Sequence, residues 1–308
     1  MKVPSAILKS LSSRRIQPAA VAPLPAATRF NRYLAAELNT LQSQGNIGLV
    51  QVLDAAITTQ KIALNSLLNI SCIDDVERGV MEEYLENNID ILDACNFFVD
   101  TIEGMKKNYG GSLRNIVERL VGANALAPAL DQLESCDDLE KKFKTMKKCG
   151  FGLRRLKLGH ESEFSEVLCG SKVMALMCCK FLELGLSLDS KSGLPLMKKW
   201  HPTSFSWLRM IHEMVEEAEG KGGEKRKRRS GSLVMNELKQ MVSAVHELKE
   251  QIKGKREKDV IRSGVERLKR SSMELEDKLG VIEGKVKDLY KTSIDVRMAL
   301  LGILSFHS

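Results

Sequence analysis

Residues 261–303 read IRSGVERLKRSSMELEDKLGVIEGKVKDLYKTSIDVRMALLGI, and this stretch decides the fold. Its apolar and small residues recur at alternating spacings of four and three, without a slip, over six heptads. They are Ile261, Val265, Leu268, Ser272, Leu275, Leu279, Ile282, Val286, Leu289, Ser293, Val296, Leu300 and Ile303. A period of 3.5 residues places them along one side of a long α-helix. Another helix has to cover such an apolar seam.

A second, shorter ladder lies directly upstream. It consists of Val234, Leu238, Met241, Val245, Leu248 and Ile252. The sequence Gly-Lys-Arg-Glu-Lys-Asp at residues 254–259 separates the two ladders and changes their phase. The simplest arrangement is an antiparallel coiled-coil hairpin over residues 233–306, with the two seams facing each other.

Charged residues beside the longer seam are of the kind that steers pairing between helices. They are Lys269, Glu276, Lys278, Glu283 and Lys285. We expect this pairing to occur within one chain, and a homodimer is the alternative.

The composition of the whole chain favours helices over strands. Of its 308 residues, 43% are hydrophobic, enough to bury a substantial core, and only 5% are aromatic. Four of the seven prolines fall within the first 25 residues, and none occurs between Pro25 and Pro128 or after Pro202. Long stretches are therefore free of the strongest helix breaker. The sequence predicts an all-α fold, a bundle of long helices with the hairpin at its C-terminus.

The net charge of +7 is concentrated in two short segments. Residues 1–36 carry six basic residues and no acid, and residues 225–229 carry five more. The remainder is slightly acidic, which argues against a basic face for nucleic acid spread over the folded body. The Ser-, Ala-, Pro- and Arg-rich segment 1–28 suits either a plastid or mitochondrial transit peptide or a disordered basic tail.

Helical periodicity begins near Phe30 and predicts a bundle over residues 29–217. Expected helices cover about residues 30–41, 47–68, 74–99, 113–120, 127–149, 162–184 and 207–215. Asp74 and Asp75 suit a helix N-terminus, whereas Gly110-Gly111-Ser112 predicts a break with Ser112 as the next cap. Residues 173–186 are apolar but too short to span a bilayer, so we expect a buried core helix. The Gly-rich, charged residues 218–232 predict a flexible linker before the hairpin.

No recognisable catalytic or metal-binding motif occurs in the sequence. Phosphate-cradling loops, nucleophile elbows and zinc-protease signatures are missing, and the five histidines lack ligand spacing. We therefore predict no catalytic, cofactor-binding or metal residues. The seven cysteines form no C-x-x-C pair and suggest a reducing compartment. Among them we expect Cys95, Cys169 and Cys178, with Met177, to fill the core as small hydrophobes. Acid pairs such as Glu82-Glu83 are interpreted as solvated helix surface.

The basic run consists of Lys225, Arg226, Lys227, Arg228 and Arg229. Such a run can bind nuclear import receptors or anionic lipid, or can be a solvated loop between helices. Ser230 and Ser232 follow it directly, where a basophilic kinase could add phosphate and cancel part of the charge. We keep this charge switch as a hypothesis.

Three strings, in order along the chain, resemble the plant BYPASS family. Residues 84–96, YLENNIDILDACN, look like its YLD-S-KLLD-CN signature, and Gly170-Ser171-Lys172-Val173 is similar to its G-KV segment, with Trp207 where a tryptophan follows. The close of the chain, with Leu300-Leu301-Gly302-Ile303-Leu304-Ser305, resembles the family's terminal coiled coil. The resemblance covers about residue 30 to the end, and none of these motifs is catalytic.

The resemblance implies a non-enzymatic helical regulator of plant development that acts through protein partners. Members of the family restrain a root-derived mobile signal that would otherwise arrest shoot growth, and are variously thought to associate with endomembranes or to enter plastids. We therefore expect an intracellular protein, cytoplasmic or weakly associated with endomembranes, with plastid and nuclear locations as alternatives. Two other functions stay open: a small-molecule carrier or enzyme with a pocket in the bundle, and a nuclear-targeted coiled-coil scaffold.

Overall fold

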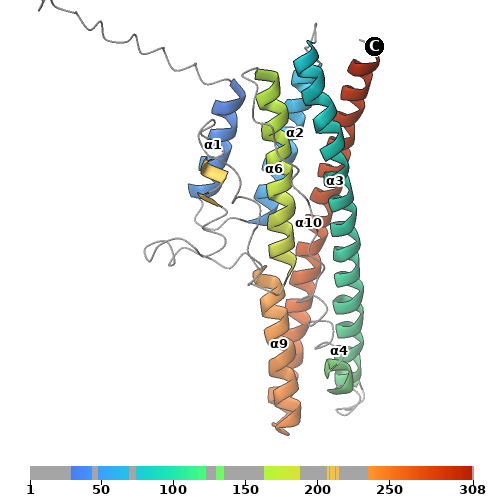
Figure 1. Ribbon diagram of the computed structural model, residues 1–308. Coiled ribbons are helices and arrows are strands. Elements are labelled where there is room, and N and C mark those ends of the chain that lie inside the picture. Colours follow the sequence, from blue (N-terminus) through green and yellow to red (C-terminus); the bar gives the residue numbers. More distant parts are fainter. Residues whose placement is uncertain are drawn as a thin grey trace, which may run out of the picture.

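A computed structural model describes residues 29–43, 48–68, 74–122, 130–134, 163–187, parts of 207–214, and 235–306. In these residues every regular element is helical, as the sequence predicts (Figure 1). The elements are α1 (Arg29–Ser43), α2 (Leu49–Leu67), α3 (Asp75–Met105), the π-helix η1 (Lys106–Gly111), α4 (Ser112–Gly122), α6 (Glu163–Leu186), α9 (Asn236–Lys253) and α10 (Lys258–Phe306). The predicted tail 1–28 and linker 218–232 lie outside the described residues.

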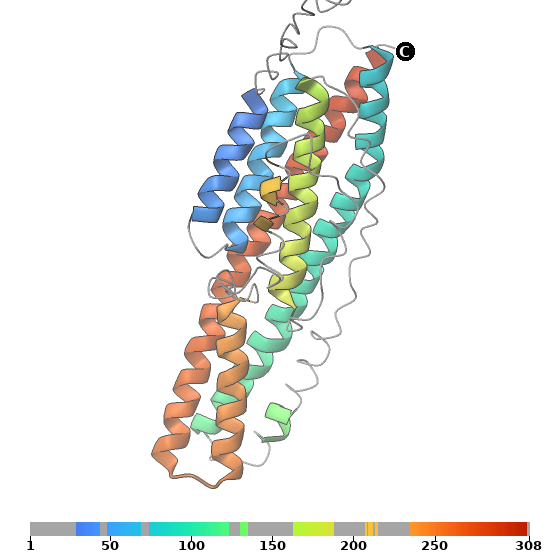
Figure 2. The same ribbon diagram turned by 60° about the vertical axis from the view of Figure 1, so that its left-hand side comes forward.

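Four long helices, α2, α3, α6 and α10, form the main bundle. α2 packs against α6 and α10, and α3 packs against the same two helices, so the four form a square in cross-section. α1 lies outside the square against α2 and α6 (Figure 2). The fold is thus the predicted long-helix bundle, and its core runs along the axis of the square.

Specific contacts give the direction of each helix in the bundle. Gln60 of α2 lies beside Ser171 of α6, and Leu49 lies beside Gly185, so α2 and α6 run antiparallel. α3 and α10 are also antiparallel, because Asn88 meets Ser293 at one level and Lys106 meets Glu283 at another. Asp54 of α2 meets Lys285 of α10, and Gln60 lies with Tyr84 near the level of Ser293, so residue numbers rise together along α2 and α10. α3 and α6 therefore run in one direction, opposite to α2 and α10.

α10 is the longest element and has two different sets of neighbours. Its 49 residues span about 74 Å at 1.5 Å per residue. The first part pairs with α9 to form the predicted antiparallel hairpin, and the later part packs between α2 and α3. We call α9 together with residues 258–279 of α10 the hairpin arm. The heptad seam thus continues from the arm into the core of the bundle.

The two ladders are buried as their spacing predicts. In α10 the buried seam residues are Ile261, Val265, Leu268, Leu275, Leu279, Ile282, Val286, Leu289, Ser293, Val296 and Leu300, while Ser272 and Ile303 are half-buried. In α9 they are Leu238, Met241, Val245, Leu248 and Ile252. Val234 lies outside the described residues. Burial of both seams accounts for the stability of helices whose outer faces are charged.

Charges beside the seam pair within the chain. Glu283 accepts from Lys106 at 2.6 Å, Lys285 meets Asp54 at 2.7 Å, and Glu276 lies 3.7 Å from Arg114. These three pairs join α10 to η1, α2 and α4. They support the expected packing within one chain for this side of α10.

α6 and α9 meet end to end, although 47 residues separate Ser187 from Met235 in the sequence. The backbone N–H of Met235 donates to the carbonyl of Gly185 at 3.1 Å, which joins the C-terminus of one helix to the start of the next. In Figures 1 and 2 the two helices follow each other along the molecule. This junction marks the level at which the bundle becomes the arm.

The predicted break at Gly110-Gly111-Ser112 is wrong. The chain continues from α3 through the single π-helical turn η1 directly into α4, without leaving helical geometry. A π-turn accommodates an extra residue inside a helix, so the two glycines widen the helix rather than end it. The predicted start of α3 is confirmed: the side chain of Asp74 accepts from the backbone N–H of Glu77 at 2.7 Å.

The apolar segment 173–186 lies in the core, as expected. In α6, residues 170–183 are buried, including Val173, Met177 and Phe181. Trp207, which follows α6 in the sequence, is fully buried, and its indole N–H donates to the side chain of Glu166 in α6 at 3.4 Å. Within the described part of the chain, no helix has the length and apolar character to cross a membrane.

Candidate functional site

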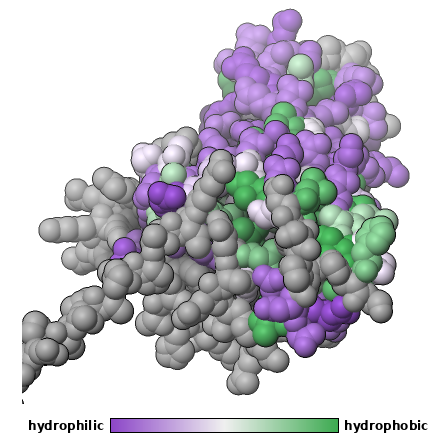
Figure 3. Space-filling view, turned by 90° about the horizontal axis from the view of Figure 1, so that it is seen from above, coloured by the Kyte–Doolittle hydropathy of each residue, from purple (hydrophilic) through white to green (hydrophobic). Residues whose placement is uncertain are grey.

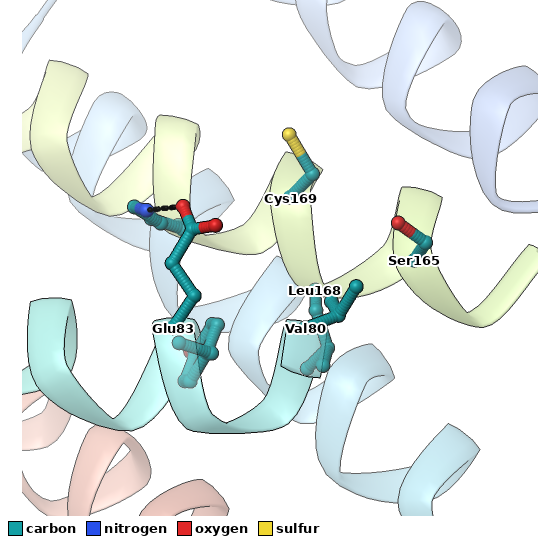
Figure 4. Close-up of a pocket in the computed structure, with 7 residues that line it drawn as sticks. Val80, Glu83, Ser165, Leu168 and Cys169 are labelled. Atoms are coloured by element: carbon teal, nitrogen blue, oxygen red, sulfur yellow. Dashed lines mark hydrogen bonds and ion pairs between the residues drawn. The ribbon is translucent and has the colours of Figure 1, made fainter. Parts of the chain in front are cut away.

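An ion pair with a buried lysine joins α3 to α6. Lys172 Nζ lies 3.3 Å from Glu83 Oε1, and the side chains are 4% and 33% exposed. Burial lowers the pKa of Lys172, and the negative charge of Glu83 opposes that shift. Glu83, expected on a solvated surface, instead has its carboxylate turned toward α6 (Figure 4).

A small hollow adjoins this ion pair. Its lining residues come from α3 and α6, and they are Val80, Glu83, Tyr84, Ser165, Leu168, Cys169 and Lys172. The volume is about 30 Å³. Such a volume holds one or two water molecules, whereas pockets for small organic ligands measure several hundred Å³. The hollow is therefore much smaller than the pockets that hold small organic ligands.

Next to the hollow, a polar layer crosses the core of the four-helix bundle. Each helix contributes to it: Gln60 from α2, Tyr84 and Asn88 from α3, Ser171 from α6 and Ser293 from α10. Tyr84 donates to Gln60 Oε1 at 2.7 Å, Gln60 Nε2 donates to the Ser171 carbonyl at 3.1 Å, and Asn88 Nδ2 donates to the Ser293 carbonyl at 3.3 Å. Together these bonds connect all four helices at one level of the bundle.

The layer is not fully satisfied. Asn88 Oδ1 and Ser293 Oγ are buried and have no hydrogen-bond partner within the described part of the chain. Each such group costs about 1–3 kcal/mol of stability. Burial also raises the pKa of Tyr84, which keeps its hydroxyl protonated and able to donate.

The cysteines of the core are poorly suited to nucleophilic chemistry. Cys95, Cys178 and Cys179 are buried free thiols, and half-buried Cys169 lines the hollow. Burial raises the pKa of Cys95 and of Cys169 to about 12, so the reactive thiolate is scarce at neutral pH. Cys95, Cys178 and Met177 lie in the core as expected, whereas Cys169 lies at its edge.

A larger hollow lies on the outside of the hairpin arm. It is an open groove of about 570 Å³ between α9 and α10. The residues that line it are Asn236, Glu237, Gln240, Glu274, Asp277, Lys278 and Val281. Three carboxylates and one ammonium give the groove a net negative charge. A shallow, charged groove of this kind is more suited to a basic protein surface than to a small organic molecule.

Several exposed apolar residues lie at the upper end of the bundle. Exposed apolar residues occur where α2 ends, where α3 begins and where α10 ends: Leu68, Val76, Leu301 and Phe306. Seen from above, green hydrophobic residues lie at this end, whereas the more distant surface is largely purple (Figure 3).

The sequence-predicted sites fall in two groups. The basic run Lys225 to Arg229, with Ser230 and Ser232, lies outside the described residues. The coiled-coil seam is described, and it serves packing inside the chain. Sequence analysis missed the polar layer, although two signals were present: the paired amides Asn87-Asn88 in an otherwise amphipathic helix, and Ser293 at a seam position.

Taken together, these features define the class of the protein: an all-α four-helix bundle with a hairpin arm and a polar layer through its core. Comparisons with models of known protein families, with curated proteins and with solved structures give no match to this chain.

Proposed function

We propose that this chain is a non-enzymatic interaction protein, a regulator of plant development of the BYPASS type. In this function the bundle is a rigid body that presents surfaces to protein partners and thereby restrains a root-derived signal that arrests shoot growth. The observation that supports this most is the way the interior is filled. Its polar side chains bond to one another and to backbone carbonyls, and the hollow beside them has room for one or two waters.

The alternative of an enzyme or carrier would use the same interior. Lys172, Glu83, Tyr84 and Cys169 are the chemically versatile groups there, and they surround a hollow of about 30 Å³. Cys169 is held as a thiol by its raised pKa, and the charge of Lys172 is neutralised by Glu83. A structural function for these groups requires none of their reactivity, only their shape and pairing.

This difference leads to a direct test. Replacing the ion pair by apolar side chains of similar size, Lys172→Met with Glu83→Leu, should preserve the fold, because buried pairs can often be exchanged in this way. In a plant that lacks the protein, we expect shoot growth to arrest and a grafted wild-type root to restore it. The double variant, expressed in the root, should restore growth as well as the natural chain does.

Two outcomes would contradict the proposal. If plants without the protein grew normally, the developmental function would be wrong. If the double variant folded normally by circular dichroism and failed to restore growth, the ion pair would have a chemical function, as in an enzyme or carrier. Val296→Asp serves as the matched folding-defective control, since Val296 is fully buried in the bundle.

A further inference from the structure

A stripe of exposed residues runs along α10 on the face that neither α9 nor α3 covers. Its members are Ser263, Arg267, Arg270, Glu274, Asp277 and Val281, and all six are exposed. They follow one another at spacings of four and three, which places them on one face of the helix, as in the buried seam. Each member lies two residues after a residue of the buried seam, so the stripe is on the solvent side of the helix.

The charges in this stripe are self-complementary. The stripe is symmetric about position 272 in the sequence. Arg270 and Glu274 lie two residues before and after it, Arg267 and Asp277 lie five, and Ser263 and Val281 lie nine. If a second copy of α10 ran antiparallel, with the two stripes facing each other and the two chains level at residue 272, each arginine would face a carboxylate. The same pairs would form twice, once on each side of the two-fold axis.

The open groove on the arm has the position and charge to receive those arginines. Glu274, Asp277 and Val281 of the stripe form one wall, and Glu237 and Gln240 of α9 form the other. At the level of Asp277, the incoming Arg267 would lie between two carboxylates, Asp277 and Glu237. The groove and the stripe are therefore parts of one surface.

The present partner of Arg267 does not prevent this pairing. Arg267 Nη1 lies 2.5 Å from Glu247 within the chain, and both side chains are about half exposed. Exposed ion pairs of this kind contribute about 0–1 kcal/mol, so exchanging the partner costs little. Arg270 and Asp277 have no ion-pair partner in the described part of the chain that would compete.

We propose that the outer face of α10 along the hairpin arm is a homodimerisation surface, in which two copies pair antiparallel along the Ser263–Val281 stripe about a two-fold axis at the level of residue 272. The occupant is a second copy, because the stripe complements its own reversed sequence, which an unrelated partner would match only by coincidence. The interface is mainly electrostatic, so dimerisation should depend on concentration and weaken as salt rises. This inference is independent of the proposed function in development.

Charge reversal tests the pairing. Analytical ultracentrifugation of the full chain should show a dimer at low salt. Both Arg267→Glu with Arg270→Glu and Glu274→Arg with Asp277→Arg should give monomers, because each places like charges opposite one another. A mixture of the two variants should form heterodimers, because the acidic stripe of one then faces the basic stripe of the other. The chain that carries all four changes should form homodimers again, because its charges are once more complementary. Arg262→Glu with Lys269→Glu, on another face of α10, is the matched control and should remain dimeric.

Cysteine cross-linking tests the register. Within one chain, residues 263 and 281 are about 27 Å apart along α10, too far for a disulfide, whereas in the antiparallel pair they face each other. Ser263→Cys with Val281→Cys should therefore give a covalent dimer on mild oxidation. Either substitution alone should give no more covalent dimer than the natural chain does, because residue 263 faces residue 281 of the second copy rather than residue 263.

Several results would overturn the proposal. A natural chain that stays monomeric at low salt and high concentration excludes the dimer. A dimer that survives both charge reversals, or single cysteine variants that cross-link as well as the double variant, places the contact elsewhere. Circular dichroism of each variant shows whether a lost dimer reflects the interface or the fold.

Discussion

Glu283 is a residue of α10 at which two lysine side chains meet. It accepts hydrogen bonds from Lys106 of the π-turn and from Lys287 one turn further along α10. Its side chain is 13% exposed, so these bonds are better shielded from water than the other ion pairs of this helix. Both ammonium groups lower the pKa of the Glu283 carboxyl from its ordinary value of 4.5.

Replacing Glu283 by Gln should lower the free energy of unfolding by about 1–2 kcal/mol at pH 7, because two charge-assisted hydrogen bonds weaken. The carboxyl has a lower pKa in the folded state, so its contribution is complete above pH 4.5 and disappears as the pH falls through the folded pKa. Urea unfolding at neutral pH and in acid should therefore show that the free energies of unfolding of the natural chain and of Glu283→Gln become equal in acid. Glu276→Gln is the control: its pair with Arg114 is 3.7 Å long and exposed, so it should change stability little. Equal losses at all pH values would contradict the linkage.

The buried thiols give a second prediction at this scale. A pKa of about 12, against an ordinary value of 9.0, reduces the thiolate fraction of Cys95 and Cys169 about a thousandfold near neutral pH. In a chain with Cys72, Cys136 and Cys149 replaced by Ser, we expect an aromatic disulfide reagent to label the four remaining cysteines slowly in the native state. In denaturant they should react at once. Rapid labelling of the folded protein would show that the core opens to solvent near these thiols.

Among the elements, α1 approaches α6 closely at one glycine. A Cβ atom on Gly170 of α6 would lie 2.4 Å from Phe30 Cε1 and 3.4 Å from Leu34 Cδ2, both side chains of α1. Phe30, Leu34 and Leu38 are buried, so this apolar face is what holds α1 in place. The glycine lets α1 approach the backbone of α6 closely.

Gly170→Ala should therefore displace α1 and destabilise the protein by about 1–3 kcal/mol, the usual cost of overpacking. Gly104→Ala in α3 is the matched control, since a Cβ there meets nothing within 4 Å. It should stabilise the helix by up to about 1 kcal/mol. Thermal unfolding of both variants gives the comparison, and a stabilised Gly170→Ala would show that α1 moves aside without cost.

The elements also show which parts of the structure can be predicted from sequence. Heptad spacing is local information, so the ladders Leu238 to Ile252 and Ile261 to Ile303 predicted two helices and their buried faces correctly. The partners of a seam are not local: nothing in the spacing indicates that α10 changes neighbours near Leu279. Likewise, Gly110-Gly111 favours a break by its intrinsic propensity, and tertiary packing beside α10 holds it in a π-turn instead. The polar layer combines residues from four distant helices, so no segment alone could reveal it.

At the scale of the whole molecule, α10 connects two regions with different degrees of burial. In the arm its outer face is open, and residues 253–260 at the tip are all exposed. In the bundle the same helix packs between α2 and α3 and contributes Ser293 to the polar layer. Local opening costs less where fewer apolar contacts have to be broken. One continuous helix should therefore have unequal stability along its length.

Native-state hydrogen exchange measures this gradient directly. We expect amides of residues 258–272 to exchange by local opening of the arm, and amides of residues 282–300 only by unfolding of the bundle. A substitution in the arm, Leu248→Ala, should speed exchange in the first group and leave the second nearly unchanged, whereas Val286→Ala should speed both. Both residues are fully buried, so the two variants are matched in burial and differ in location. Uniform protection along α10, with equal responses to both substitutions, would mean instead that the arm and the bundle unfold as one cooperative unit. In that case the seam would transmit stability over its whole length, and the end-to-end contact between Gly185 and Met235 would be the natural place to look for the second connection.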